Sequence, residues 1–220
     1  MSTEAHAVDQ STLAADWGGG TFPYHVGHKK LGMWLFIVSD AMTFSALLIG
    51  YSYVRASSDE WPAPFHFYPS VVFSTVMTLC LLASSFTMVM AVGASSRRNK
   101  RAARRWIMLT ILGGLTFLVL HLYEWYHLIH DYGLKPFSLP EEWAREWPNA
   151  PPLFGACFFT ITGLHMFHVL TGVIYLGWIA FKIRRVRHED VEISGLYWHF
   201  VDLVWMFVFP LIYLMSVHAG

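Results

Sequence analysis

Five long apolar runs restrict the folds open to this chain of 220 residues more than any other feature of its sequence. They cover approximately residues 31–54, 69–94, 106–129, 153–183 and 195–217. The hydrocarbon core of a membrane is about 30 Å thick, and roughly 20 helical residues cross it. Backbone groups in that core must be hydrogen-bonded within the protein, and the runs do not alternate as barrel strands do. The sequence therefore predicts an all-α membrane protein, a bundle of five transmembrane helices.

The composition agrees with this fold class. Only 14% of the residues are charged and 55% are hydrophobic, whereas about a quarter of a typical soluble domain is charged. The formal net charge is zero, so nothing in the composition indicates a nucleic-acid partner. The two cysteines, Cys80 and Cys157, form no CxxC pair and predict neither a zinc site nor a redox dithiol.

The positions of Lys and Arg predict the orientation of the helices. Twelve of these 15 residues lie before the first run, between the second and third, or between the fourth and fifth, counting Lys182 at the end of the fourth run. Because cytoplasmic loops are rich in Lys and Arg, we expect the N-terminus inside and the C-terminus outside. Residues 1–28 are expected to be a polar cytoplasmic tail, and residues 29–220 the transmembrane domain. The outer connection at residues 135–152 is expected to include one short interfacial helix.

Eight titratable side chains are expected at membrane depth. They are Asp40, His121, Glu124, His127, His165, His168, His199 and Asp202. On insertion scales, a charged side chain at the centre of a membrane helix costs about 2.5–3.5 kcal/mol. These groups must therefore face the bundle interior or a partner. Several of them are three residues apart, which places both members of a pair on one helix face.

Two interpretations of these groups remain open from the residues alone. In the first, they bind a metal ion or a haem. A di-iron bundle uses two Glu-x-x-His pairs and two further Glu residues, and only Glu124 and His127 match that spacing here. In the second, they are interhelical hydrogen-bond partners that fix the register of the bundle, each worth about 0.6 kcal/mol. Asp40 has no Lys or Arg in its run, so we expect it to be protonated or bonded to a neighbouring helix.

Small residues and one proline predict details of the packing. Gly113, Gly114, Gly172 and Gly177 lie inside apolar runs, where small residues let helix backbones approach closely. Pro210 removes a backbone hydrogen bond and is expected to bend the last helix.

Four segments carry motifs that resemble a known family. They are residues 31–40 (LGMWLFIVSD), 124–126 (EWY), 158–169 (FFTITGLHMFHV) and 197–205 (YWHFVDLVW). In this order, and each on a predicted helix, they resemble subunit III of the haem–copper oxidases, in its five-helix bacterial form. The resemblance covers roughly residues 29 to 218. The last segment contains the signature residues Tyr197, Trp198, Phe200 and Trp205, and Asp40 stands where the family usually has Glu.

The resemblance implies an accessory subunit with no catalytic residue, no metal site and no cofactor of its own. The haems and copper would belong to partner subunits, with subunit I as the main contact and subunit II and membrane lipids, including bound phospholipid, as further partners. A larger respiratory supercomplex is also left open. The complex would reduce oxygen to water and pump protons in the bacterial cytoplasmic (inner) membrane.

The role that the resemblance implies is to support assembly, lipid binding and sustained proton uptake by subunit I. Cytochrome c is favoured as the electron donor. Three alternatives are kept: subunit III of a quinol oxidase, the related accessory subunit of a nitric-oxide reductase, and a separate enzyme with metal bound to the His and Glu faces.

Overall fold

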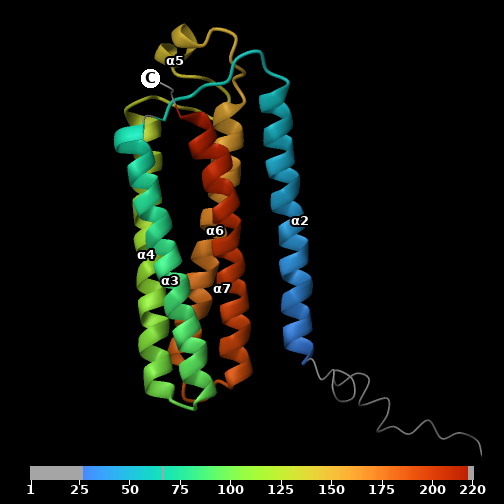
Figure 1. The fold of residues 1–220 in the computed structure, drawn as a ribbon, viewed down its shortest axis with the longest axis vertical. Helices are drawn as coiled ribbons and strands as arrows, with labels where there is room; N and C mark the ends of the chain where they lie inside the picture. Colours follow the sequence, from blue (N-terminus) through green and yellow to red (C-terminus); the bar gives the residue numbers. More distant parts are fainter. Residues whose placement is uncertain (1–26, 66, 218–220) are drawn as a thin grey trace, which may run out of the picture.

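The computed structural model describes residues 27–65 and 67–217, and its architecture is helical (Figure 1). Five long helices run along the long axis: α2 (His28–Ala56), α3 (Val72–Ser96), α4 (Lys100–His130), α6 (Phe154–Phe181) and α7 (His188–Val208). The short helix α5 (Glu141–Glu146) lies at one end. The segment η1 (Phe67–Val71) precedes α3, and the turns η2 (Phe209–Tyr213) and η3 (Leu214–Ser216) follow α7.

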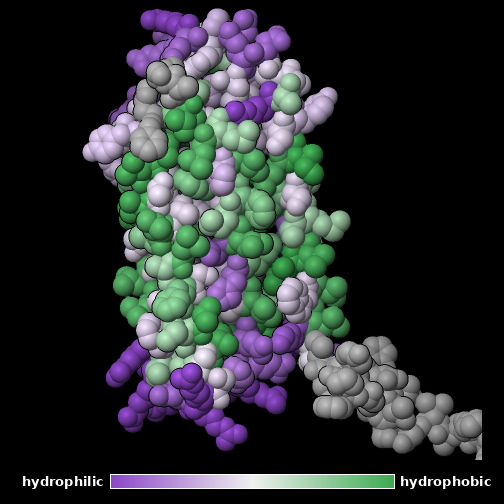
Figure 2. All heavy atoms as spheres, in the orientation of Figure 1, coloured by the Kyte–Doolittle hydropathy of each residue, from purple (hydrophilic) through white to green (hydrophobic). Residues whose placement is uncertain are grey.

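The prediction of five helices that can cross a membrane is confirmed. Five helices are long and apolar enough to span one, the last being α7 together with the turns that follow it, His188–Ser216. Figure 2 shows the matching surface, a broad hydrophobic belt between two hydrophilic ends. The expected cytoplasmic tail, residues 1–28, falls almost wholly outside the described residues, and His28 already belongs to α2.

The last helix begins seven residues earlier than the apolar run at residues 195–217 predicted. The hydropathy pattern did not include residues 188–194 in the helix, because they contain the charged residues Glu189, Asp190 and Glu192. Asp190 accepts a hydrogen bond from the backbone N–H of Arg187 at 3.1 Å, which satisfies one of the free donors at a helix start. His199 and Asp202 therefore lie in the middle of α7, rather than near its start.

Four of the helices form a bundle, and α2 packs beside it. Around the bundle α3 contacts α4 and α7, and α6 likewise contacts α4 and α7. Large aromatic side chains fill its centre, among them Phe117, Trp198 and Trp205, all fully or almost fully buried. A Cβ atom on Gly114 would lie 2.5 Å from the Trp198 ring, so this glycine lets α4 approach α7 as expected. Gly177, by contrast, faces open space.

Helix α2 is attached to the bundle by a few polar contacts. Of the residues in an apolar 18-residue window of α2, 11% are buried, against 33% to 56% in the other four spanning helices. At one end Lys29 pairs with Asp190 at 2.8 Å, and at the other the Tyr51 hydroxyl lies 3.4 Å from that of Ser216. In the middle of α2, Asp40 is hydrogen-bonded to His168 on α6. Because apolar packing is sparse here, these contacts fix where α2 sits.

The end of the molecule that carries α5 is closed by links between distant segments. The backbone N–H of Phe65 donates to the Ser216 carbonyl at 3.3 Å, and that of Asn149 donates to the Glu60 carboxylate at 3.0 Å. Helix α5 is the short helix expected within residues 135–152. Regular α-helix ends at Val208, just before Pro210, where wider π-helical turns take over. The hydrogen-bond pattern of the helix therefore changes at this proline.

Replacing Gly114 by Ala is expected to destabilise the chain by about 1–3 kcal/mol, because the Trp198 ring must move to admit the methyl group. The midpoint of thermal unfolding in mild detergent measures the effect. Gly50→Ala is the matched control, because nothing lies within 4 Å of its added Cβ and Ala favours the helix. Equal midpoints for the two variants would show that the contact between α4 and Trp198 is not tight.

Candidate functional site

The polar groups at membrane depth lie mainly between helices. His121, Glu124, His165 and Asp202 are buried, and Asp40, His168 and His199 are partly buried. His127 is exposed near the end of α4. The structure brings these groups together in separate clusters rather than in one centre.

The first cluster joins α2 to α6. His168 Nε2 lies 3.0 Å from Asp40 Oδ2, so the expected bond from Asp40 to a neighbouring helix is present. His168 Nδ1 lies 2.7 Å from the Leu164 carbonyl, which can only accept, so Nδ1 carries a hydrogen. A second hydrogen must lie between His168 and Asp40. The pair is therefore neutral overall, whichever partner holds that proton, and this suits its depth in the membrane.

The second cluster surrounds Glu124 and joins α4 to α3 and η2. The Tyr213 hydroxyl donates to Glu124 Oε2 at 2.7 Å, and Ser74 Oγ lies 3.0 Å from Oε1. Ser74 Oγ is also 3.0 Å from the Ser70 carbonyl. One hydroxyl hydrogen cannot serve two acceptors well. All three groups are satisfied when Glu124 is a neutral acid that donates to Ser74, while Ser74 donates to Ser70.

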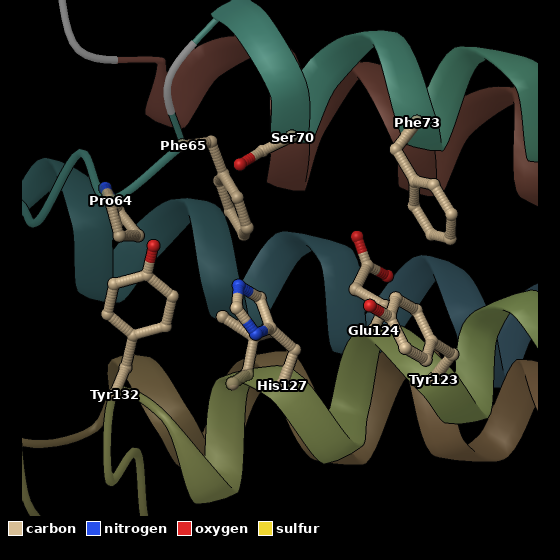
Figure 3. Close-up of a pocket in the computed structure, with 9 residues that line it drawn as sticks. Pro64, Phe65, Ser70, Phe73, Tyr123, Glu124, His127 and Tyr132 are labelled. Carbon is tan, nitrogen blue, oxygen red and sulfur yellow. The ribbon is translucent and has the colours of Figure 1, made fainter.

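A cavity of about 280 Å³ opens beside Glu124 between the start of α3 and the end of α4 (Figure 3). Its walls include the aromatic rings of Phe65, Phe73 and Tyr123. His127 lies on the same face of α4 and also lines the cavity, but its imidazole pairs with Asp131, not with Glu124. Glu124 and His127, three residues apart on α4, therefore line the same cavity without bonding to each other.

His121 and His165 differ from the expected hydrogen-bonded role. Both are fully buried, and none of their ring nitrogens has a hydrogen-bond partner within residues 27–65 and 67–217. They pack against aromatic rings instead. His165 stacks on Trp205 with ring centroids 5.0 Å apart, and His121 stacks on Phe117 at 5.5 Å. Glu124 approaches His121 to 3.6 Å, which is too long for a hydrogen bond.

The third cluster lies between α3 and α7. His199 Nδ1 is 2.6 Å from Ser85 Oγ, and Ser85 also faces the Asp202 carboxyl. The other carboxyl oxygen, Asp202 Oδ1, is buried and has no hydrogen-bond partner in the part of the chain that the structure describes. This cluster is thus the one whose carboxyl group is left partly unsatisfied.

The aromatic residues of the 197–205 segment connect α7 to both of its neighbours in the bundle. Trp198 Nε1 donates to Ser84 at 3.1 Å and Trp205 Nε1 donates to Thr78 at 2.9 Å, both on α3. On the other side the Tyr197 hydroxyl donates to the His168 carbonyl on α6 at 3.0 Å. The remaining signature residue, Phe200, is buried and lines a groove between α7 and α2.

Sequence reasoning missed most of the partners in these clusters. They are Ser74, Thr78, Ser84 and Ser85 on α3, Thr171 on α6 and Tyr213 after α7. Ser and Thr are common in membrane helices and carry no charge, so none stood out singly. The available signal was the number of hydroxyl groups along α3.

The geometry bears on what these clusters can do chemically. No three His, Cys, Asp or Glu side chains in the described part of the chain converge closely enough to hold a metal ion. The metal alternative therefore lacks a ligand set among these residues. What the clusters visibly do is bind helix to helix.

The fold and these clusters define a class of protein: a helical membrane protein whose intramembrane polar groups mainly join its own helices. Comparison with known proteins gives the family. A family model described as cytochrome c oxidase subunit III matches residues 8–217. The chain belongs to the cytochrome c oxidase subunit III family. It is therefore one subunit of a multi-subunit oxidoreductase.

Individual relatives agree with this assignment. The chain is similar to cytochrome c oxidase subunit 3 of Alkalihalophilus pseudofirmus, with 31% identity over 86% of this chain and 88% of the relative. The corresponding values for subunit 3 of Bacillus subtilis are 29%, 86% and 87%. A relative in Pseudomonas putida, named cytochrome bo(3) ubiquinol oxidase subunit 3, is 29% identical over 85% of this chain and 86% of its own length.

Replacing Asp40 by Asn is expected to leave assembly nearly intact. The Asn amide can donate to His168 Nε2, whose neighbour Nδ1 still donates to Leu164. Asp40→Leu leaves Nε2 unpaired and should loosen α2 by roughly 0.6–1.7 kcal/mol. The fraction of each variant that stays in its complex after detergent extraction measures the effect. Complete loss of Asp40→Asn from the complex would contradict the neutral pair.

Replacing Glu124 by Gln is expected to change the stability by less than about 1 kcal/mol, because the amide reproduces both bonds of a neutral acid. Glu124→Leu should cost about 1–3 kcal/mol, since it leaves the buried Tyr213 hydroxyl without its acceptor. Unfolding midpoints in mild detergent compare the two variants. If Gln is as harmful as Leu, Glu124 is ionised rather than protonated.

Proposed function

We propose that the chain is the non-redox subunit III of a respiratory terminal oxidase, with cytochrome c favoured over quinol as the electron donor. It supports assembly, binds lipid and sustains proton uptake by subunit I while that subunit reduces oxygen to water. The observation that carries this proposal is the use of the membrane-depth polar groups. Those of the 197–205 segment, together with Glu124 and Asp40, bond neighbouring helices.

The orientation within the proposal has the N-terminus on the cytoplasmic side of a bacterial inner membrane. The connections α3–α4 and α6–α7, with the start of α2, lie at one end of the molecule (Figure 1). Twelve of the 15 Lys and Arg residues lie in the first turn of α2 or in or beside those connections. Cytoplasmic ends of membrane proteins carry such an excess.

A basic pocket at the same end supports the lipid-binding part of the proposal. It has a volume of about 420 Å³ and lies between the start of α4 and the end of α6. Arg104, Lys182, Arg184 and Arg185 line it, beside the exposed ring of Phe181. None of these cations forms an ion pair with a carboxylate of the described residues. Basic pockets at this depth suit the phosphate of an anionic lipid.

The electron donor has a second candidate. Most of the relatives that we compared are cytochrome c oxidase subunits, but the Pseudomonas putida relative is named as a ubiquinol oxidase subunit. Both kinds of complex would use this chain in the same accessory way. The distinction therefore lies in the partner subunits.

Purification of the tagged chain from its native membrane in mild detergent tests the proposal. We expect a larger haem-containing subunit to co-purify, and the complex to consume oxygen with reduced cytochrome c faster than with a quinol. The chain separated from its partners should show no haem absorbance. Stoichiometric haem or metal on the separated chain, or oxygen consumption by it, would overturn the proposal.

A further inference from the structure

The cavity beside Glu124 offers more hydrogen-bonding groups than the fold uses. Besides Glu124 and His127, its wall carries three hydroxyl groups, those of Ser70, Tyr123 and Tyr132. None of these hydroxyl groups is hydrogen-bonded to another of the described residues. Figure 3 shows Ser70 facing the rings of His127 and Tyr132 across the cavity. A molecule in the cavity would therefore meet hydrogen-bonding groups on two opposite walls.

His127 adds a ring nitrogen to these groups. Its Nδ1 pairs with the carboxylate of Asp131, one turn further along α4, and this contact keeps a hydrogen on Nδ1. Nε2 has no partner within residues 27–65 and 67–217. It accepts a hydrogen bond when the imidazole is neutral and donates one when the imidazole is protonated. The cavity can therefore bind a hydroxyl group as well as a carbonyl group.

The rest of the cavity wall is mainly aromatic and carries no cation. The rings of Phe65, Phe73, Tyr123 and Tyr132 line it, and none of its described lining residues is Lys or Arg. The phosphate of a lipid binds where basic side chains gather, so this cavity does not match an anionic headgroup. Aromatic side chains favour a flat ring, which stacks on them or meets their edges.

The size and the position of the cavity suit a ring that carries an apolar chain. A cavity of about 150 Å³ holds one benzene molecule, so a volume of about 280 Å³ has room for one substituted six-membered ring. Val76 and Val119 lie about one turn further into the membrane than Phe73 and Tyr123, and they are 47% and 64% exposed. An apolar chain on the ring can leave the cavity along these side chains and lie in the lipid.

We propose that this cavity binds the ring of a quinone or a quinol, with the apolar chain of that molecule in the surrounding lipid. The Ser70 and Tyr132 hydroxyl groups donate to the carbonyl oxygens of a quinone, and a quinol hydroxyl donates to Nε2 of His127. The site binds the ring and changes none of its bonds. The inference goes beyond the proposed function and does not depend on the electron donor, because the binding groups belong to this chain.

Photolabelling of the complex purified in mild detergent tests the site. The probe is a short-chain benzoquinone that carries an azido group. We expect labelled peptides from residues 64–73 and 123–132, and loss of the label in the presence of excess quinone without the azido group. A short-chain phosphatidylglycerol should not displace the probe. Label confined to other segments or other subunits, label that excess quinone does not remove, or displacement by the phospholipid alone would overturn the inference.

Substitutions in the cavity provide a second measurement, the affinity for the quinone from its competition with the probe. Tyr132→Phe keeps the ring but removes the hydroxyl, and it should weaken binding about three- to tenfold, as expected for one lost hydrogen bond. His127→Leu should weaken quinol binding by at least as much. Tyr126→Phe is the matched control, because Tyr126 is 60% exposed on the same helix and lies outside the cavity. Equal affinities for all three variants would contradict the proposed contacts.

The outcomes separate this inference from the proposed function. If a haem-containing subunit co-purifies but the labelled peptides lie elsewhere, the quinone site is wrong and the proposed function stands. If the expected peptides are labelled but no haem-containing subunit co-purifies, the proposed function fails and the quinone site stands.

Discussion

Most of the polar side chains inside this bundle find a hydrogen-bond partner on another part of the chain, and this constraint organises the structure. Hydrocarbon offers neither donors nor acceptors, so the backbone forms helices and the side chains pair across them. Trp198, Trp205 and Tyr213 each donate to another part of the bundle. Because apolar packing gives little preference for one helix neighbour over another in lipid, these bonds decide which helix lies beside which.

Helix α7 forms hydrogen bonds or ion pairs with three other helices and is therefore the centre of the fold. Its indole groups bond α3, its Tyr197 bonds α6, and Asp190 at its start binds α2. A glycine on α4 makes room for Trp198 in the middle of the bundle. A single segment of nine residues, 197–205, thus reaches three neighbouring helices by hydrogen bonds or close packing. That density of contacts gives a physical reason for the segment to carry the recognisable signature.

The sequence predicted the number of helices and the polar groups at depth, because both follow from apolar length and from the cost of burying charge. It could not place the start of α7, since Glu189 and Asp190 precede the apolar run and the Lys29 partner of Asp190 comes from α2. The partner of Asp40 was also hidden, because Asp40 and His168 are 128 residues apart. Spacing along one helix shows a shared face but not which helix lies opposite.

The clusters divide by how completely the chain satisfies them. Asp40 is matched by His168, and Glu124 is matched on both oxygens, so these groups complete the bundle from within. Asp202 has one oxygen without a donor among residues 27–65 and 67–217, and it lies beside the partly buried His199 and Ser85. The ring nitrogens of His121 and His165 also have no partner among the described residues, and these two rings stack on Phe117 and Trp205 instead. Hydrogen bonds between helices and aromatic packing around buried imidazoles are therefore two separate ways in which this bundle places polar side chains at membrane depth.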